Sequence, residues 1–588
     1  MGMDGLVVHR LVEELNELLR NARLHRVLQP SATTVLLLLR QPGTNHLLVL
    51  CADPTEPRVH LTAGEPPANP PAALGFCMVL RKHLEPARLL AVEQPGLERV
   101  VTLRFEMRDS SGQRAERLLT TELMGRHSNM LLVDPTGPTI LDGIRRVSAS
   151  QSRYREVYPG RPYLPPPRQD KEHPFTITAE RFFFNLRHTP APTQIARALV
   201  EGYHGLGPDA AREIVARAGL PVTATRAEVN ASQAEALWGA LQEIVTGVET
   251  GKVEPWAACD PNGGPVNFWV FPLTHGPQDE SAKCFDSVNA LLDWYFTKRQ
   301  QEAELERTRS ELLRVVEAAL AKAERRVGVH EASLMASERA EEYRLRGELL
   351  LSQLHQIPEG VATATVANYY EEGASIRITL DPSLSVAANA EAYFRKYQKA
   401  RRARQQAEMQ LKASREDTAY LRGVLDAVQR ATNQKDIDEI REELRVQGLI
   451  PVAQRTSATH PQTSGHLRVR AHDGTEILVG KNNKQNDAIT MKLAKPDDLW
   501  LHVKDAAGAH VVVRSTSPEI APDTLALALQ LAALHSQARH SSLVPVDYCL
   551  RRYVRKPRGA KPGFVIYDHH KTAYVTPDSD EVKRLRAY

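Results

Sequence analysis

The stretch Asp497–Arg514, DDLWLHVKDAAGAHVVVR, predicts a β-hairpin near the C-terminus. In its first half, Leu499–Lys504, apolar side chains alternate with polar or aromatic ones, which is the period of a strand with one buried face. The segment Asp505–Gly508 supplies turn residues before a second β-branched run. The pattern therefore predicts a sheet in this region and places His502 near His510 across the hairpin.

Two histidines beside a tryptophan suggest either a metal or acid–base site, or a packed hairpin with polar edges. A metal site needs a third and a fourth ligand at workable spacing. The neighbouring sequence offers neither a cysteine nor a second histidine cluster at such a spacing. We therefore predict no metal and no cofactor, and we interpret Trp500, His502 and His510 as scaffold residues of the hairpin.

The length and composition favour a multidomain intracellular protein. A chain of 588 residues is too long for one hydrophobic core. Its five cysteines are scattered and form no CxxC pair, which argues against a disulfide framework and a structural zinc. Charges recur along the first residues, and no stretch approaches the roughly 20 apolar residues of a membrane span. We expect a cytoplasmic protein with no membrane partner.

The net charge of +4 is unevenly distributed along the chain. From Gly465 to the end there are 19 Lys and Arg against 13 Asp and Glu, a balance of +6, so the rest of the chain is slightly acidic. A basic module on a nearly neutral body indicates an anionic partner such as nucleic acid, although such an excess also occurs on ordinary solvated surfaces.

Shifts in composition divide the chain into segments. A mixed helix and strand region closes in the proline run YPGRPYLPPP, helical patterns follow, and a polar linker precedes the basic module. The predicted segments are residues 1–172, 173–283, 284–450 with an insert at about 357–385, 451–464 and 465–588.

Two charge-dense runs, residues 284–356 and 387–445, carry apolar residues at heptad-like intervals. At about 1.5 Å per residue, each run would extend on the order of 90 to 110 Å. We expect the two runs to pair as an antiparallel arm with the insert at its far end. The heptads alone also fit a coiled coil that dimerises two chains.

Gly205-Leu206-Gly207 joins two short helical patterns. Glycines between helices allow a sharp turn and a close approach of the backbone to a phosphate, as in helix-hairpin-helix modules. The same pattern also fits an ordinary turn between two packed helices, so the sequence leaves both interpretations open.

Several enzyme motifs fail at particular positions. GTEILVGKNN departs from a P-loop because Gly474 and Gly480 are one residue too far apart, and Asn482 stands where Ser or Thr should hold magnesium. The sequence contains no GxSxG elbow and no HExxH motif. We therefore do not expect a conventional hydrolase or nucleotide triphosphatase.

Several motifs in order along the chain resemble the NFACT family. VGKNNKQNDAIT, DDLWLHVKDAAGAHVVVR and VPVDYCLRRYVRKPRGAKPGFVIY are similar to its RNA-binding domain. MDGLVVHRLVEEL, FCMVLRKHLE, MGRHSNMLLVD and YPGRPYLPPP are similar to its N-terminal domain, and LDPSLSVAANAEAYFRKYQKA is similar to the return into its coiled coil. The resemblance covers essentially the whole chain.

This resemblance implies a multidomain α+β fold. The implied parts are an N-terminal domain similar to that of formamidopyrimidine-DNA glycosylases, a helix-hairpin-helix module, a long antiparallel coiled coil with a small tip insert, and a C-terminal α/β RNA-binding domain.

The resemblance also implies a role in ribosome-associated quality control. Bacterial members of this kind bind a large ribosomal subunit that still holds peptidyl-tRNA, recruit alanyl-tRNA and direct template-free alanine tailing of the stalled chain for degradation. A small S4-domain RNA-binding helper protein is a further implied partner. The ribosome forms the peptide bonds, so the chain itself would not be an enzyme, and it would act by positioning its RNA partners.

Site residues follow from the same resemblance. The tRNA-engaging Asp-Arg pair of the family is matched here by Glu98-Arg99, and an early aspartate is matched by Asp4. A neighbouring carboxylate would orient the arginine toward a phosphate or base edge, although the pair also fits a surface salt bridge. The tRNA-binding candidates are Asp4, Glu98, Arg99, Arg126 and His127. The RNA- or ribosome-binding candidates are Lys481, Asn482, Asn483, Lys484, Trp500, His502, His510, Arg552, Arg555, Lys556, Arg558 and Lys561.

Two other classes of function are alternatives. A DNA glycosylase of the similar fold would need an N-terminal proline amine and zinc-finger cysteines, whereas this chain begins Met1-Gly2-Met3-Asp4. A surface adhesin that binds fibronectin, the historical label of the family, would be expected to carry a secretion signal, an anchor motif or a repeat array. We see none of these in the sequence.

Overall fold

The computed structural model describes residues 3–66, 70, 72–108, 112–261, 263–275, 282–337, 339–371, 374–451, 465–514 and 520–585. The chain divides into two compact units, Met1–Glu302 and Ala303–Tyr588. The predicted linker lies outside the described residues from position 452 onward. Across the described ranges, every helix is too short or too polar to cross a membrane.

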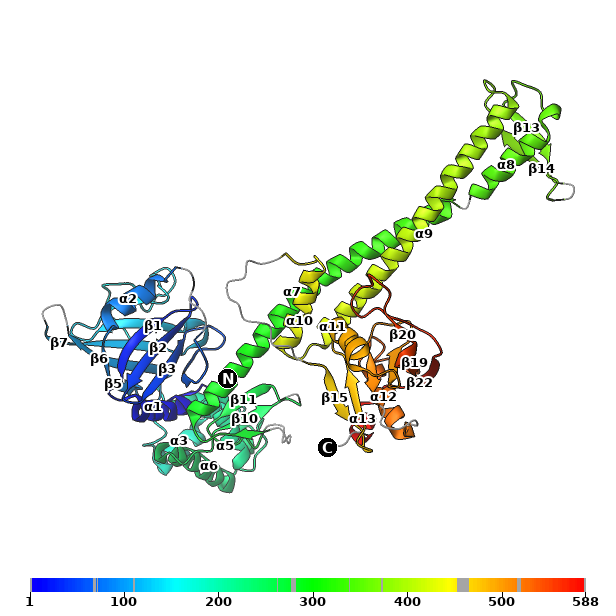
Figure 1. Ribbon diagram of the computed structural model, residues 1–588. Coiled ribbons are helices and arrows are strands. Elements are labelled where there is room, and N and C mark those ends of the chain that lie inside the picture. The colour runs from blue at the N-terminus through cyan, green and yellow to red at the C-terminus, as the bar shows by residue number, and fades with distance from the viewer. Residues whose placement is uncertain are drawn as a thin grey trace. The chain divides into compact units, whose positions relative to one another are not determined.

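The first unit is built on a nine-stranded antiparallel sheet in the order β4-β3-β2-β1-β5-β6-β7-β8-β9, drawn in blue and cyan in Figure 1. Helices α1 (Gly5–Leu19) and α2 (Gly75–Leu84) contribute apolar side chains to the core that the sheet also lines. The strands are β1 (Arg23–Leu28), β2 (Thr34–Gln41), β3 (Thr44–Cys51), β4 (Arg58–Thr62), β5 (Arg88–Glu93), β6 (Val100–Arg108), β7 (Arg114–Glu122), β8 (Asn129–Asp134) and β9 (Thr139–Gly143).

A helical region and a small sheet complete this unit. Their apolar residues join the same core as the large sheet, so the described part of 173–283 packs onto the N-terminal sheet region. The small sheet has the order β11-β10-β12. The elements are α3 (Ala179–His188), α4 (Ile195–Gly202), α5 (Pro208–Arg217), η2 (Arg226–Glu228), α6 (Ala231–Thr250), β10 (Trp256–Cys259), β11 (Pro265–Trp269) and β12 (Lys283–Cys284).

The first turn of the long helix α7 (Val288–Ser337) is anchored in the first unit. The Glu14 carboxylate accepts hydrogen bonds from the backbone N–H groups of Val288 and Asn289, at 2.9 and 2.8 Å. An acceptor in this position satisfies N–H groups that the helix itself leaves unpaired. The Asn289 side chain also bonds both backbone groups of Leu61 on the edge strand β4, so the start of α7 is fixed to the sheet.

In the second unit, α7 pairs with α9 (Val386–Arg430) in the antiparallel sense. Three ion pairs show this, because the partner number on α9 falls as the number on α7 rises: Glu324–Arg422, Arg326–Asp417 and Glu331–Arg415. Apolar residues of the two helices share one buried cluster. The predicted intramolecular, antiparallel pairing of the two helical runs is confirmed.

The predicted lengths of these runs were wrong, because each run is two helices. The first run contains α7 and α8 (Ala340–Ser352) as separate helices. The second ends at Arg430, and Asn433 caps a new helix, α10 (Gln434–Val446), which packs into the same cluster as α9. The 50 residues of α7 and the 45 of α9 extend about 75 and 68 Å, less than expected.

The insert between α8 and α9 is a β-hairpin with its own small core. Strand β13 (Thr363–Ala367) pairs antiparallel with β14 (Ser375–Thr379), after the short helix η3 (Leu354–Gln356). Val366 and Ile378 are buried together with Leu349 and Leu350 of α8. The hairpin therefore closes the two helices into one body at the far end of the arm (Figure 1).

The C-terminal domain is a six-stranded antiparallel sheet in the order β15-β16-β18-β17-β19-β22, drawn in orange and red in Figure 1. The predicted hairpin is confirmed, since β17 and β18 pair with Leu499 opposite Val513. The strands are β15 (Leu467–Arg470), β16 (Glu476–Val479), β17 (Leu499–Val503), β18 (Val511–Val513), β19 (Val544–Leu550), β22 (Lys571–Val575) and the separate pair β20 (Val554–Arg555) and β21 (Ile566–Tyr567). The helices are α11 (Asn483–Asp487), η4 (Ala488–Leu493), α12 (Pro522–Leu534), η5 (Arg551–Tyr553) and α13 (Ser579–Leu585).

The prediction that β17 has only one buried face was wrong. Leu499, Leu501 and Val503 pack in the cluster that contains α12. Trp500 lies in a second cluster on the other face, together with Ile489 of η4 and Tyr567 of β21. The strand is central in its sheet and covered on both faces, which its alternating pattern did not reveal.

Candidate nucleic-acid interface

Asp4 is a buried helix cap. One carboxylate oxygen accepts hydrogen bonds from the backbone N–H groups of Leu6 and Val7 at the start of α1, and the other accepts one from the Trp269 indole N–H at 3.0 Å. The side chain is shielded from solvent, and this desolvation raises its pKa to about 6. In this conformation Asp4 organises the interior and offers no surface to a tRNA.

The glycines of the predicted helical hairpin approach Asp4 and its neighbours. The Gly5 N–H donates to the Gly205 carbonyl at 2.9 Å. A Cβ on Gly207 would lie 2.8 Å from the Asp4 Cβ, and Gly205 has a positive φ of 75° with Leu97 against it. These glycines therefore permit a close approach to protein, which favours the interpretation as a packed turn between α4 and α5.

Arg99 lies at the end of the large sheet where β6 begins and β7 ends. Val100 pairs with Glu122, and the Leu123 N–H donates to the Arg99 carbonyl at 2.8 Å. The Arg99 side chain is exposed. Glu98 faces His204 instead, with Oε1 3.7 Å from Nδ1, so this carboxylate is oriented toward the helical region and not toward Arg99.

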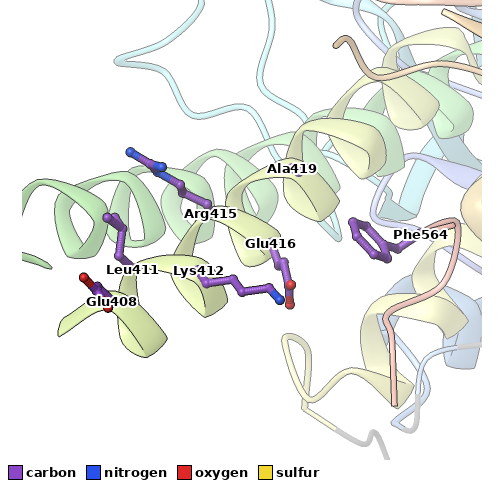
Figure 2. Close-up of a pocket in the computed structure, with 7 residues that line it drawn as sticks. All are labelled: Glu408, Leu411, Lys412, Arg415, Glu416, Ala419 and Phe564. Atoms are coloured by element: carbon purple, nitrogen blue, oxygen red, sulfur yellow. The ribbon is translucent and has the colours of Figure 1, made fainter. Parts of the chain in front are cut away.

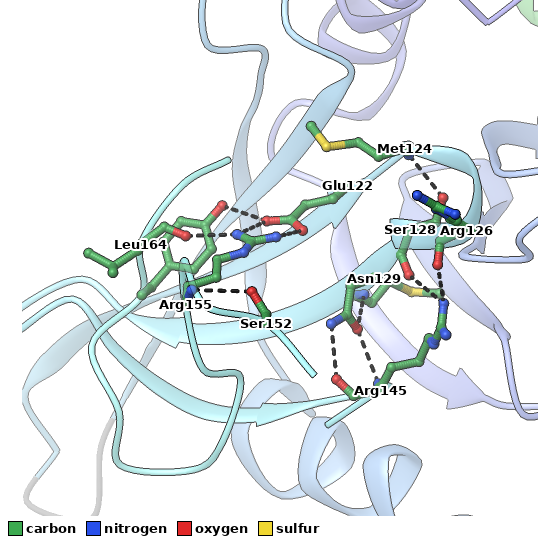
Figure 3. Close-up of polar contacts among 11 residues, drawn as sticks. Glu122, Met124, Arg126, Ser128, Asn129, Arg145, Ser152, Arg155 and Leu164 are labelled. Carbon is green, nitrogen blue, oxygen red and sulfur yellow. Dashed lines mark hydrogen bonds and ion pairs between the residues drawn. The ribbon is translucent and has the colours of Figure 1, made fainter. Parts of the chain in front are cut away.

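The loop that follows β7 is held by hydrogen bonds to its backbone, as Figure 3 shows. The Ser128 hydroxyl accepts from the Met124 N–H at 2.9 Å, and the Arg145 guanidinium donates to the Arg126 carbonyl at 2.9 Å. The Asn129 side chain bonds both backbone groups of Arg145. The short helix η1 (Gly125–His127) thus has a fixed backbone, while the side chains of Arg126 and His127 are exposed.

Arg99 and this loop meet at one cavity of about 440 Å³. Its wall includes aromatic side chains from β11 and α7, which the sequence patterns did not single out. Arg299, paired with Glu56 at 3.2 Å, adds a second guanidinium to the lining. The lining residues that matter here are Met3, Arg99, Gly125, Phe268, Tyr295 and Arg299. An exposed arginine beside an apolar, aromatic hollow is an arrangement that can hold the phosphate and the base of a nucleotide.

In the cluster of Trp500 with the two histidines, Trp500 and His510 are buried and His502 is partly exposed. The Trp500 ring lies 5.9 Å from His502 and 5.2 Å from His510, and Tyr567 packs at 4.9 Å. Burial lowers the pKa of His502 to about 4 and holds that of His510 well below its usual value, so both rings are neutral near pH 7. The Thr490 hydroxyl bonds His510 Nδ1 at 2.8 Å. Trp500 and His510 therefore pack as scaffold residues, whereas the RNA contacts that were also predicted for them have no exposed face here.

The residues that the structure describes contain no group of three or more His, Cys, Asp or Glu side chains that could hold a metal ion. The two histidines that raised the question of a metal site, His502 and His510, face each other at 5.3 Å between ring centroids as the hairpin predicted. Their neighbours are the aromatic ring of Tyr567, the Thr490 hydroxyl and one carboxylate, that of Asp547 opposite His502 on β19, which accepts from the Tyr567 hydroxyl.

The segment Lys481–Asn483 contacts α10 of the arm. Lys481 Nζ lies 3.2 Å from an Asp436 carboxylate oxygen. The Asn482 and Asn483 amides donate to the carboxylates of Glu439 and Glu443, at 2.8 and 3.1 Å. In addition Lys561 pairs with Asp417 of α9, and its ammonium lies 4.9 Å from the Tyr420 ring centroid. Four candidate RNA ligands are thus engaged within the protein.

The remaining basic candidates fall into two groups. Three have acidic partners within the C-terminal domain: Arg552 with Asp497, Arg555 with Asp568, and Lys556 with Asp487. Lys484 and Arg558 are exposed, and across the described ranges neither side chain has an ion-pair partner. Among the basic candidates of the C-terminal domain, these two therefore combine exposure with no ion-pair partner in the described ranges.

Comparison with models of known protein families shows the family to which this chain belongs. Residues 4–463 match the model of the NFACT N-terminal and middle domains, and residues 466–565 match that of the NFACT protein RNA binding domain. The chain belongs to the NFACT family. The basic module that contains the hairpin is therefore the RNA-binding domain of an NFACT protein.

NFACT relatives match along their full length. The chain is 36% identical over 592 residues to the Rqc2 homolog RqcH of Bacillus subtilis, and 32% identical over 590 residues to that of Streptococcus suis; all of each chain is covered. A solved structure of the C-terminal part of the fibronectin/fibrinogen-binding protein from Streptococcus suis is 33% identical, with a TM-score of 0.39, over 48% of this chain and 99% of that chain.

Proposed function

We propose that this NFACT protein is a ribosome-associated quality-control factor. It binds a large ribosomal subunit that holds peptidyl-tRNA, recruits alanyl-tRNA and directs template-free alanine tailing of the stalled chain. The observation that carries this proposal is the identity of 36% to an Rqc2 homolog RqcH over all of both chains. The matched RNA-binding domain at residues 466–565 supports an RNA partner independently.

The protein acts in this proposal by positioning RNA, and the ribosome forms the peptide bonds. Holding two RNA partners in a reactive arrangement removes much of the entropic cost of their encounter without any nucleophile from the factor. The long antiparallel helix pair of the second unit suits contact with a partner as large as a ribosomal subunit. The exposed Arg99, beside the fixed loop Gly125–His127, suits contact with a tRNA.

Sequencing the RNA that copurifies with the intact chain from cells tests the proposal. Large-subunit ribosomal RNA together with one dominant tRNA species is the expected result, and alanyl-tRNA is the species that the proposal specifies. Recovery of DNA or of no specific RNA would contradict the proposed function.

A double substitution, Glu98→Ala with Arg99→Ala, tests the tRNA site. We expect the copurified tRNA and the alanine tails to be lost, while cosedimentation with the large subunit stays near normal. Arg114→Ala is a matched control, because Arg114 is an exposed arginine at the opposite end of β6 and β7. Retention of tRNA by the double variant would move the site elsewhere on the first unit.

A further inference from the structure

The arm and the RNA-binding domain meet at what we call the arm-base joint: the contacts of α9 and α10 with residues 481–485 and 561–563. The arm contributes carboxylates and the domain contributes lysines and amides. The joint contains Lys481–Asp436, Asn482–Glu439, Gln485–Glu439, Asn483–Glu443 and Lys561–Asp417. Cationic and amide residues of the RNA-binding domain are therefore matched to anionic groups of the same chain.

The centre of the joint is buried and sterically specific. Asn483 lies between Gly423 of α9 and Gly563, where a Cβ would come within 3.2 and 2.6 Å of the Asn483 side-chain oxygen. Glu443 accepts from the Asn483 amide and from the Tyr420 hydroxyl, and burial raises the pKa of this carboxyl. These contacts hold the domain on the arm independently of its two lysines.

The two lysines lie at the edge of the joint. Their side chains are 30% exposed at Lys481 and 35% at Lys561. Partly exposed ion pairs contribute little to stability, and salt screens them. Three residues along the chain from Lys561, Phe564 lines a cavity of about 400 Å³ together with the α9 residues Leu411 and Ala419, and Figure 2 shows Phe564 facing that helix. The partial exposure of Lys561 leaves this lysine accessible to solvent, and therefore to a polyanion, at the edge of the joint.

We propose that Asp417 and Asp436 mask Lys561 and Lys481 from RNA, so that the arm-base joint is an autoinhibitory contact within the chain. The carboxylates occupy the positions that phosphates of single-stranded RNA take when the two ion pairs at the edge of the joint break, while the buried centre stays closed. The inference rests on the proposed RNA-binding function and adds that the free chain holds part of its cationic surface in reserve. Contact with a dense array of phosphates, as in ribosomal RNA, then exchanges one set of anions for another.

The test compares the full-length chain with the double variant Asp417→Asn with Asp436→Asn, using labelled oligouridine as the probe. The substitutions remove the masking charges and leave the lysines in place; Asp417→Asn also releases Arg326 of α7 from its ion pair, so the gain is assigned to the lysines only by neutralising them. We expect affinity to rise about tenfold at low salt, and the dependence of log affinity on log salt to steepen by about 0.7 for each released lysine. A matched control removes two charges elsewhere on the arm, by Asp438→Asn on α10 and Glu317→Gln on α7, and reports the general effect of a less negative arm.

Neutralising the lysines gives the second half of the test. Lys481→Gln with Lys561→Gln should leave the affinity of the otherwise unchanged chain as it is, because both side chains are already occupied. The same pair should abolish the gain when it is added to the double aspartate variant. An affinity gain no larger than that of the control variant overturns the proposal. The proposal is also overturned if neutralising the lysines lowers oligouridine affinity by the same factor with and without the aspartate substitutions. If the aspartate variant folds poorly, a loss of affinity when the lysines of the otherwise unchanged chain are neutralised is enough to overturn it.

The outcome is separable from that of the proposed function. Oligouridine binding is measured on purified chains and needs no ribosome, whereas the proposed function is tested by the RNA that the unaltered chain carries from cells. If the oligouridine test fails but ribosomal RNA still copurifies, only the autoinhibitory contact is rejected. If ribosomal RNA does not copurify but the oligouridine test succeeds, only the ribosomal role is rejected.

Discussion

The predicted site residues of the first unit and those of the second unit differ in their exposure to solvent. In the first unit, Arg99 and the loop Gly125–His127 place side chains on the surface over a rigid backbone. In the second unit, Trp500 and His510 are buried in a cluster that packs the sheet. Both groups were predicted from their resemblance to family motifs. A motif therefore identifies a position that the family uses, and only the fold shows whether the position serves a partner or the core.

The largest test of this difference is Trp500→Ala. Removing a fully buried indole should lower the free energy of unfolding by about 3 to 5 kcal/mol, because a cavity replaces its packing. Tyr574→Ala, an exposed aromatic on β22 of the same sheet, is the control and should change stability by about 0.5 kcal/mol or less. Denaturant unfolding followed by circular dichroism measures both. A small stability loss with weakened RNA binding would instead assign Trp500 to the interface.

Asp4 was a tRNA-binding candidate of the first unit, but unlike Arg99 it is buried. Its pKa is raised by burial from 3.8 to about 6, so the folded state keeps a proton that the unfolded chain releases. The contribution to stability is therefore full below about pH 4 and is lost as pH rises to about 6, by up to about 3 kcal/mol. We expect the difference in unfolding free energy between the unaltered chain and Asp4→Asn to fall across that range. A difference independent of pH would show that Asp4 titrates normally.

Sequence patterns predicted the features that depend on residues close together in the chain. The alternation in Leu499–Lys504 gave the hairpin and the approach of His502 to His510, and the heptads gave two helices that pair. Burial on both faces of β17 depends on α12 and Tyr567, which belong to other segments. No periodicity within the strand encodes those neighbours.

Pairing of charges is equally non-local. The basic segment RRYVRKPRGAKPG suggested a phosphate-binding surface, yet Lys561 meets Asp417 from the arm and Lys556 meets Asp487 from α11. The break of the second helical run had a local signal, since Asn433 is a good N-cap, but the continuing charge pattern obscured it. Helix ends and ion-pair partners therefore required the structure, whereas the hairpin strands and the two paired helical runs did not.

Arg99→Lys tests whether the exposed Arg99 binds tRNA through its guanidinium geometry or through its charge alone. A guanidinium presents a planar fork that an ammonium cannot reproduce, so a bidentate contact should lose about 1 to 2 kcal/mol of tRNA affinity on change to Lys, and more on change to Ala. Filter binding of alanyl-tRNA to the purified chain measures this loss. Glu98→Gln is the control, because Glu98 faces His204 and should change tRNA affinity little. Equal binding by the Lys variant would mean that only the charge at position 99 is used.

The smallest expected effect separates free from paired cations within the RNA-binding domain. Lys484 and Arg558 are exposed, and in the described parts of the chain their side chains have no ion-pair partner, whereas Arg555 and Lys556 face Asp568 and Asp487. Neutralising Lys484 and Arg558 together should flatten the slope of log RNA affinity against log salt by about 0.7 for each residue. Neutralising Arg555 and Lys556 should flatten this slope less. Each is already neutralised by a carboxylate, so RNA binding releases fewer salt ions from it. Equal slopes for the two double variants would show that RNA displaces these carboxylates as readily as it displaces salt, and that partners seen in the free chain do not predict which cations bind.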